Sequence, residues 1–521
     1  MEQTNLPSHG AQAAEAEALA AAAAAAAAAD LEQGLTRHLM EYHQSEASSD
    51  ESARQRPRVG RVPPHVRNLD GGAEAYTPKF VSIGPIHHAD ATLRRHSHDL
   101  KVAYLHALIA RRTPDPIDEV AVLAALIGYK AGVAAVEDRA RRFYKEPVDE
   151  HGLTAEAFVD LLVLDAAFLL EHMLNLATGY EDPLLHRTHW APSQLHSDLI
   201  RFENQVPFFV VAELLARSPL HRDPELEACR AGGRRDFLRS IGVHCLLRKD
   251  DEELKTLPPS DDIHHLLHLY SLSLTEARLR RPHAHAGLGA TAWRALWKLP
   301  IVTLMPFAYL LCSGGADDGK GEEDEAAVKL PNIPSATDLQ RVGIKFKRAP
   351  RKPDGGFLDV RLEDGDTLVI PMVNIEQFTA PQLQNLIALE QATPELPDDC
   401  SCYAFFMDNL VANPADVALL ESEGILKSNL GSHKAVVTYF NKLCKGNKLE
   451  VEGNYLRSVF EALMERNRNP MYAWIRTLRK KYFSSPWGII AMVVTLFVFA
   501  STVLQTYISI VQYYFANNGD Y

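Results

Sequence analysis

Cysteine is scarce in this sequence, with 6 residues among 521. So few cysteines cannot form the framework of a small disulfide-rich scaffold, and Cys400 and Cys402 are too close in sequence to bridge each other in the ordinary way. A chain of this length can bury a sizeable hydrophobic core without such bridges. We therefore expect reduced thiols and exclude the disulfide-rich class.

Net positive charge is also lacking, because 54 Lys and Arg residues stand against 67 Asp and Glu residues, which gives a formal net charge of -13. An acidic chain repels a polyanion, so we expect no nucleic-acid partner. The rest of the composition, 46% hydrophobic and 23% charged, is that of an ordinary globular protein.

A basic targeting signal is missing from the N-terminal region. The first basic residue is Arg37, whereas a secretory signal starts with positive charge and a transit peptide has scattered arginines. The run Ala20–Ala29 is too short to cross a membrane, and Gln44–Arg61 has almost no large apolar side chain to repay the entropy of ordering. Residues 1–60 are therefore predicted to be a disordered, alanine-rich acidic extension.

Near the C-terminus, by contrast, an uncharged apolar run extends from Trp487 to Val511. As a helix it is about 37 Å long, enough to cross a hydrocarbon layer of about 30 Å. Basic residues between Arg476 and Lys481 precede the run and none follows it, so the positive-inside rule places the body in the cytosol. We predict one transmembrane helix, 487–511, with a short tail, 512–521, in the plasma membrane or an endomembrane. The residues chosen to mark this anchor are Trp487, Gly488, Leu496, Phe499 and Val511. The alternative is a buried core helix.

The body of the chain has mainly helical periodicity. Apolar spacing predicts two amphipathic helices in Leu93–Val136, and Ala155–Leu176 is apolar nearly all round, as in a helix at the centre of a core. Pro207 should divide Leu195–Leu215 into two helices, with Glu203, Asn204 and Gln205 capping the junction. Further helices are expected in Asp261–Leu272 and, after Pro381, around Leu383–Leu389, Val417–Ile425 and Tyr455–Ile475.

A glycine-rich acidic segment, 313–330, separates a first helical part, 61–312, from a second part, 331–480. In the second part, Phe357–Leu362 and Thr367–Ile370 flank an Asp-Gly turn, which is a strong hairpin signal, and Gly343–Lys347 alternates like a strand. The predicted fold class is therefore mainly α: a large multi-helix body with a small antiparallel β insert and a C-terminal transmembrane helix.

Motifs for cofactors and metals are incomplete. Gly314–Lys320 has the glycines and lysine of a phosphate loop, but position 321 lacks the Ser or Thr, and Gly287–Ala292 follows no strand. His264, His265 and His268 have helical spacing but lack the further ligands of a zinc site. We predict no cofactor and no metal.

Catalytic motifs are equally sparse, since the sequence contains neither a G-x-S-x-G elbow nor a kinase signature set. Asp165 and Glu203 lie in apolar surroundings, where a raised pKa would suit acid–base catalysis but where carboxylates more often have structural roles. We assign no catalytic residue and predict a non-enzymatic protein. The alternative is an unrecognised membrane-tethered hydrolase or transferase that uses Asp165, Glu203 and the histidines 264–268.

Several segments together resemble a plant family known as domain of unknown function 247, also called uncharacterised protein family 0481. The resemblance covers Arg61 to the C-terminus and depends on Val81-Ser82-Ile83-Gly84-Pro85-Ile86-His87-His88, Glu203-Asn204-Gln205-Val206-Pro207-Phe208-Phe209, Pro334-Ser335-Ala336-Thr337 and Asn385-Leu386-Ile387-Ala388-Leu389-Glu390. Ile86 and Leu389 depart from the family pattern, so the chain resembles a divergent, grass-type member.

The resemblance implies no catalytic activity and no cofactor. Some grass members are associated with self-incompatibility, so the resemblance implies a membrane-tethered recognition or signalling role of the kind used in reproductive self/non-self recognition. The protein partner and the oligomeric state are left open by the sequence. The family-motif residues that we take as candidate site residues are Gly84, Pro85, His87, His88, Asp165, Glu203, Asn204, Gln205, Pro207, Ser335, Ala336, Asn385 and Glu390.

Overall fold

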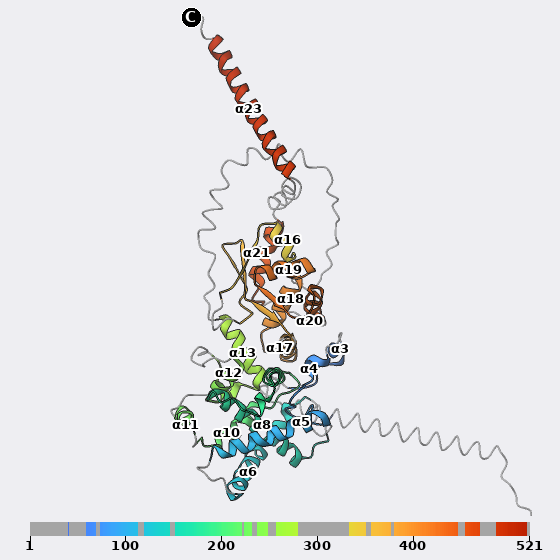
Figure 1. Ribbon diagram of the computed structural model, residues 1–521, viewed down its shortest axis with the longest axis vertical. Helices are drawn as coiled ribbons and strands as arrows, with labels where there is room; N and C mark the ends of the chain where they lie inside the picture. Colours follow the sequence, from blue (N-terminus) through green and yellow to red (C-terminus); the bar gives the residue numbers. More distant parts are fainter. Residues whose placement is uncertain are drawn as a thin grey trace, which may run out of the picture. The chain divides into compact units, whose positions relative to one another are not determined.

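The computed structural model (Figure 1) describes residues 40, 59–68, 73–112, 119–145, 152–220, 223–231, 237–247, 257–279, 333–350, 356–376, 380–445, 454–468 and 486–517. Outside these ranges lie nearly all of the predicted extension 1–60, the segment 313–330, both glycine-rich motifs near 287 and 314, and the basic flank of the predicted anchor.

The first half of the described chain is entirely helical. Its α-helices are α3 (Pro64–Arg67), α4 (Ala73–Tyr76), α5 (Ala91–Ala110), α6 (Glu119–Ala134), α7 (Glu137–Phe143), α8 (Ala155–Ala177), α9 (Ala191–Leu199), α10 (Phe208–Ala216), α11 (Pro224–Ala231), α12 (Phe237–Leu247) and α13 (Leu266–Leu279). Short 3-10 turns at Leu185–Arg187 and Ser260–Asp262 complete this half.

Helix α8 is the centre of the core, as its all-round apolar sequence predicts. Thr154 caps its N-terminus by accepting a hydrogen bond from the N–H of Ala157. Side chains on every side of α8 are buried, Phe158, Leu162 and Phe168 completely, because α5, α6, α10 and α12 pack around it (Figure 1). The two helices expected in Leu93–Val136 are α5 and α6.

The second half combines helices with short strands. Its elements are α16 (Ala336–Arg341), β1 (Lys345–Arg348), β2 (Arg361–Glu363), β3 (Thr367–Ile370), β4 (Val373–Ile375), α17 (Ala380–Ala392), α18 (Asp399–Leu410), α19 (Pro414–Ser422), β5 (Leu426–Ser428), α20 (His433–Cys444) and α21 (Arg457–Arg468). Helix α17 packs against α4 and α13 of the first half (Figure 1).

The predicted hairpin is present, but the prediction of a purely antiparallel insert is wrong. β2 and β3 pair antiparallel across a turn in which Asp364 and Gly365 have φ of 52° and 71°. β1 pairs parallel with β3, on the side away from β2, and β4 pairs parallel with β5. The second pairing also removes Ile425 from the predicted helix, because α19 ends at Ser422 and the chain becomes extended at Leu426. Local alternation predicts a strand but not its distant partner.

The C-terminal helix α23 (Pro486–Asn517) contains the predicted anchor 487–511 and has no charged residue over its 32 residues. Within the part of the chain whose side chains the structure describes, no single helix is long and apolar enough to cross a membrane. Helices α6 and α7 meet the criterion only as a pair, bent by 58°. A membrane span at 487–511 therefore stays a prediction.

Candidate functional site

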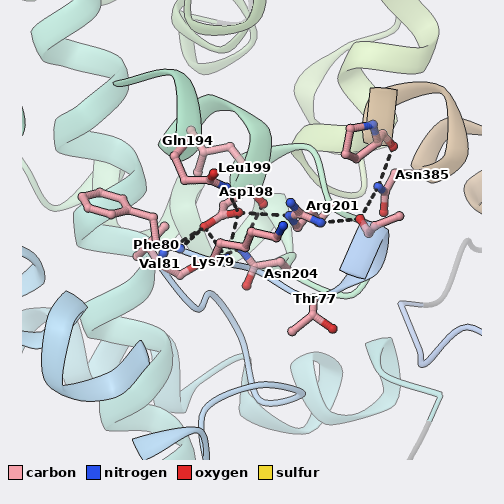
Figure 2. A network of polar contacts seen from close by, with 12 residues as sticks. Thr77, Lys79, Phe80, Val81, Gln194, Asp198, Leu199, Arg201, Asn204 and Asn385 are labelled. Carbon is pink, nitrogen blue, oxygen red and sulfur yellow. Dashed lines mark hydrogen bonds and ion pairs between the residues drawn. The ribbon is translucent and has the colours of Figure 1, made fainter. Parts of the chain in front are cut away.

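Buried polar side chains from both halves of the chain, among them the candidates Asn204 and Asn385, form a network (Figure 2). Its first centre is Asp198, near the end of α9, a fully buried carboxylate. It accepts hydrogen bonds from three consecutive main-chain N–H groups, those of Lys79, Phe80 and Val81, at 2.6–3.1 Å. The guanidinium of Arg201 pairs with the same carboxylate at 3.0 Å. Asp198 therefore holds an extended segment of the N-terminal chain against the helical core.

Arg201 and Asn385 extend this network from the first half to the second (Figure 2). Arg201 donates to the main-chain oxygens of Glu74 and Ala75, and burial lowers its pKa despite the neighbouring Asp198. Asn385, on α17, donates to the same Ala75 oxygen at 2.9 Å and accepts from the N–H of Phe202 at 2.8 Å. One side chain of α17 thus binds two separate segments of the first half.

Asn204 and Gln205 use their amides in the same way. Asn204 accepts from the N–H of Ile83 at 2.6 Å and donates to the Val81 oxygen at 3.0 Å. Gln205 donates to the carbonyl oxygens of Leu199, at the end of α9, and of Arg201, and accepts from the N–H of Leu267 at 3.1 Å. These amides therefore satisfy backbone groups of irregular segments and of the end of α9 and the start of α13.

The prediction that Glu203, Asn204 and Gln205 cap the helix junction is confirmed for Asn204 and Gln205 at the end of α9 and wrong for the start of α10. The helices do end and begin as expected, α9 at Leu199 and α10 at Phe208, with Pro207 at the N-cap position. Asn204 and Gln205 donate to the carbonyl oxygens of Asp198 and Leu199 in the last turn of α9, at 2.9 and 2.8 Å, whereas no side chain caps α10 by a hydrogen bond.

Glu203 is the centre of a second cluster. Its buried carboxylate accepts from the N–H of Val62 at 2.9 Å, contacts Nε2 of His87 at 2.9 Å and pairs with Arg67. Burial alone would raise its pKa, but the hydrogen bonds from His87, Arg67 and Val62 outweigh burial and lower the pKa below its ordinary value. Glu203 is therefore suited to remain ionised rather than to act as a general acid at neutral pH.

Asp165, on α8, holds the turn that contains Gly84 and Pro85. Its carboxylate accepts from the N–H of Gly84 at 2.8 Å and pairs with the buried ammonium of Lys101. Burial raises the pKa of Asp165, although Lys101 opposes the shift. In the same turn, Nδ1 of His88 lies 2.6 Å from the oxygen of Pro85.

The histidine group lies at the N-terminus of α13 and has a structural geometry. Nδ1 of His268 accepts from the N–H of His264, and Nδ1 of His265 accepts from the N–H of His268, both at 3.2 Å. Burial lowers the pKa of His265, and it lowers that of His268 to about 3. Within the described part of the chain, no group of three or more His, Cys, Asp or Glu residues is arranged to hold a metal ion.

The remaining candidates hold the second half together. Ser335 caps α16, whose first residue, Ala336, is fully buried. Glu390, on α17, accepts from the N–H groups of Cys400 and Ser401 at 2.7 and 2.8 Å, and so binds the N-terminus of α18. Burial raises the pKa of Glu390 to about 7.

The main effect of this arrangement is to hold main-chain segments in place through hydrogen bonds. Within the described residues, the carboxylates of Asp165, Asp198 and Glu203 accept from main-chain N–H groups and from Lys, Arg, His and Gln side chains. That set contains no hydroxyl or thiol that these carboxylates could activate as a nucleophile.

Four members of the network were missed from the sequence: Arg67, Lys101, Asp198 and Arg201. The Asp-Arg pair at i and i+3, directly before Glu203, was an available signal. Arg67 and Lys101 had no comparable signal, because their partners are 136 and 64 residues away.

The residues of the network all lie within the part of the chain that matches one protein family. Residues 59–501 match the model of DUF247, a plant protein of unknown function. The UPF0481 protein At3g47200 of Arabidopsis thaliana is 27% identical over 444 residues, or 84% of each chain. The putative UPF0481 protein At3g02645 of the same plant is 22% identical over 486 residues, covering 83% of this chain and 87% of its own. No solved structure matches this chain.

Proposed function

The chain belongs to the DUF247 family of plant proteins, and we propose that it is a membrane-anchored, non-enzymatic recognition or signalling protein. In this proposal α23 crosses the plasma membrane or an endomembrane once, and the body presents a surface to a protein partner in the cytosol. A role in reproductive self/non-self recognition has the family resemblance alone as its support.

The observation that carries the proposal is the surface of α23. Its large apolar side chains are exposed, including Phe497, Phe499 and Leu504 at 73%, 65% and 60%. A helix of 32 residues without charge is about 48 Å long, and such a surface is stable against lipid rather than water. The non-enzymatic part of the proposal is supported by the carboxylate network, whose hydrogen bonds come from backbone N–H groups and from Lys, Arg, His and Gln side chains.

Membrane fractionation of the full chain in plant cells tests the anchor. We expect the wild type in the membrane fraction and resistant to carbonate extraction, because α23 spans the bilayer. Replacing Phe499 and Leu504 by Arg should move most of the protein to the soluble fraction, since each arginine near a helix centre costs about 2.5–3.5 kcal/mol on insertion. The control, Leu184→Arg on an exposed loop, should stay with the membrane.

Protease protection of intact vesicles tests the orientation. A tag at Met1 should be digested and a tag at Tyr521 protected. A protected N-terminal tag would place the body in the lumen or outside the cell, and soluble wild-type protein would refute the anchor itself.

A further inference from the structure

Helix α6 has an exposed apolar face that the proposed anchor does not explain. Val120, Leu123 and Ile127 are 75%, 58% and 60% exposed. Ala124, Ala131 and Ala134 are also exposed. They lie on the same face as these three residues, because the six positions recur at the three- and four-residue spacing of a helix. We call these six residues the α6 stripe.

The opposite face of α6 belongs to the core. Ala125, Tyr129, Gly132 and Val133 are buried where α6 packs against α8 and α10. Both faces of the helix are therefore apolar, and the described part of the chain covers only one of them. An apolar stripe in water is costly, so the second face fits a docking surface.

We propose that the α6 stripe binds the α6 stripe of a second copy of this chain, antiparallel about a two-fold axis. An axis level with the peptide between Ala125 and Leu126 places Val120 opposite Ala131 of the other copy. The same register places Ala124 opposite Ile127. Large side chains thus meet small ones, each contact occurs twice, and such self-complementarity is what a two-fold interface requires.

Two features of the helix support this register. Gly128 flanks the stripe, and a Cβ there would meet nothing within 4 Å, so the site of closest approach is open. Glu119 and Lys130 are about three helical turns apart and lie on one edge of the stripe. Antiparallel pairing brings like edges together, so Glu119 of each copy meets Lys130 of the other. Lys130 also pairs with Asp160 at 2.6 Å, and its ammonium has further donors.

The mass of the full chain in detergent, measured by sedimentation over a range of protein concentrations, tests the proposal. We expect a dimer whose dissociation constant rises at least tenfold in Ile127→Glu, because each copy then places a carboxylate against Ala124 of the other in an apolar contact. Leu184→Glu removes an exposed apolar side chain elsewhere and should leave the dimer intact. Both positions are exposed, so both variants should fold.

Crosslinking tests the register itself. Under oxidation, the double variant Val120→Cys, Ala131→Cys should give a covalent dimer in high yield, whereas either single variant should behave like the wild type. A wild type that is monomeric at every concentration overturns the proposal. So does a dimer unaffected by Ile127→Glu, which would pair through another surface such as α23. If Ile127→Glu instead reduces flotation with lipid vesicles at unchanged mass, the stripe contacts lipid and self-pairing is wrong.

Discussion

At the scale of single residues, the buried polar side chains of this protein act mainly on its own backbone. Asp198 binds three consecutive N–H groups, and Asn204 binds an N–H and a carbonyl of the same segment. A buried N–H or carbonyl without a partner costs about 1–3 kcal/mol. Each of these side chains avoids that cost, and so stabilises an irregular segment inside the core. The motif residues are thus explained by folding before any chemistry is invoked.

Gly84 gives the sharpest test of this explanation. Its φ is 77°, and a Cβ there would lie 2.5 Å from the main-chain oxygen of Gln205. We expect Gly84→Ala to lower the free energy of unfolding by about 3 kcal/mol, through both left-handed strain and backbone displacement. Urea unfolding of the full chain in detergent measures it.

Gly179→Ala is the matched control, because its φ is 69° but a Cβ there meets nothing within 4 Å. It should cost only about 1 kcal/mol, the strain alone. Equal effects of the two substitutions would show that the contact between Gly84 and Gln205 is not tight.

At the scale of elements, Glu390 joins two helices by binding the N-terminus of α18 from α17. Its pKa is about 7 in the folded chain and near 4.5 when unfolded. Between these values the folded state holds the extra proton, so this group makes stability fall as pH rises from about 4.5 to 7. The full effect is about 3 kcal/mol, and it persists above pH 7.

The variant Glu390→Gln should lose this pH dependence whatever its overall stability. Urea unfolding of wild type and variant at four pH values from 4.5 to 7.5 measures the difference in slope. The exposed Glu395→Gln should retain the wild-type slope. Parallel curves for wild type and Glu390→Gln would contradict the assignment.

At the scale of the whole molecule, Asn385 couples the two halves of the chain, which form one compact unit over Pro57–Tyr521. We expect Asn385→Leu to lower the free energy of unfolding by about 3 kcal/mol, because the N–H of Phe202 and the oxygen of Ala75 lose a buried partner. If the halves unfold together, hydrogen exchange should accelerate equally in α8 and α18.

Asn409→Leu is the control, because among the described residues the side chain of Asn409 bonds only to the Phe405 oxygen in its own helix. Its effect should be below about 1 kcal/mol. Faster exchange confined to α17 and α18 in Asn385→Leu would mean that the halves unfold separately.

Much of the fold followed from local pattern. The central helix α8, the division of the chain at Pro207 and the β2–β3 hairpin were predicted, since each depends on apolar periodicity or turn chemistry within a few residues. The parallel pairing of β1 with β3 and of β4 with β5 was not, because it joins residues far apart in sequence. Distance in the sequence is also the reason why Lys101 and Arg67 were missed, because they act by pairing with Asp165 and Glu203.

The sequence by itself determined a mainly helical chain and an uncharged C-terminal helix, because composition and periodicity are local properties. The family was identified by the resemblance of several motifs, and the family match confirms it. Only the tertiary structure decided which polar side chains clamp which backbone and which face of α6 remains exposed. The reason is physical: Val120 and Val133 are equally apolar in sequence, and packing against α8 and α10 alone determines that one is exposed and the other buried.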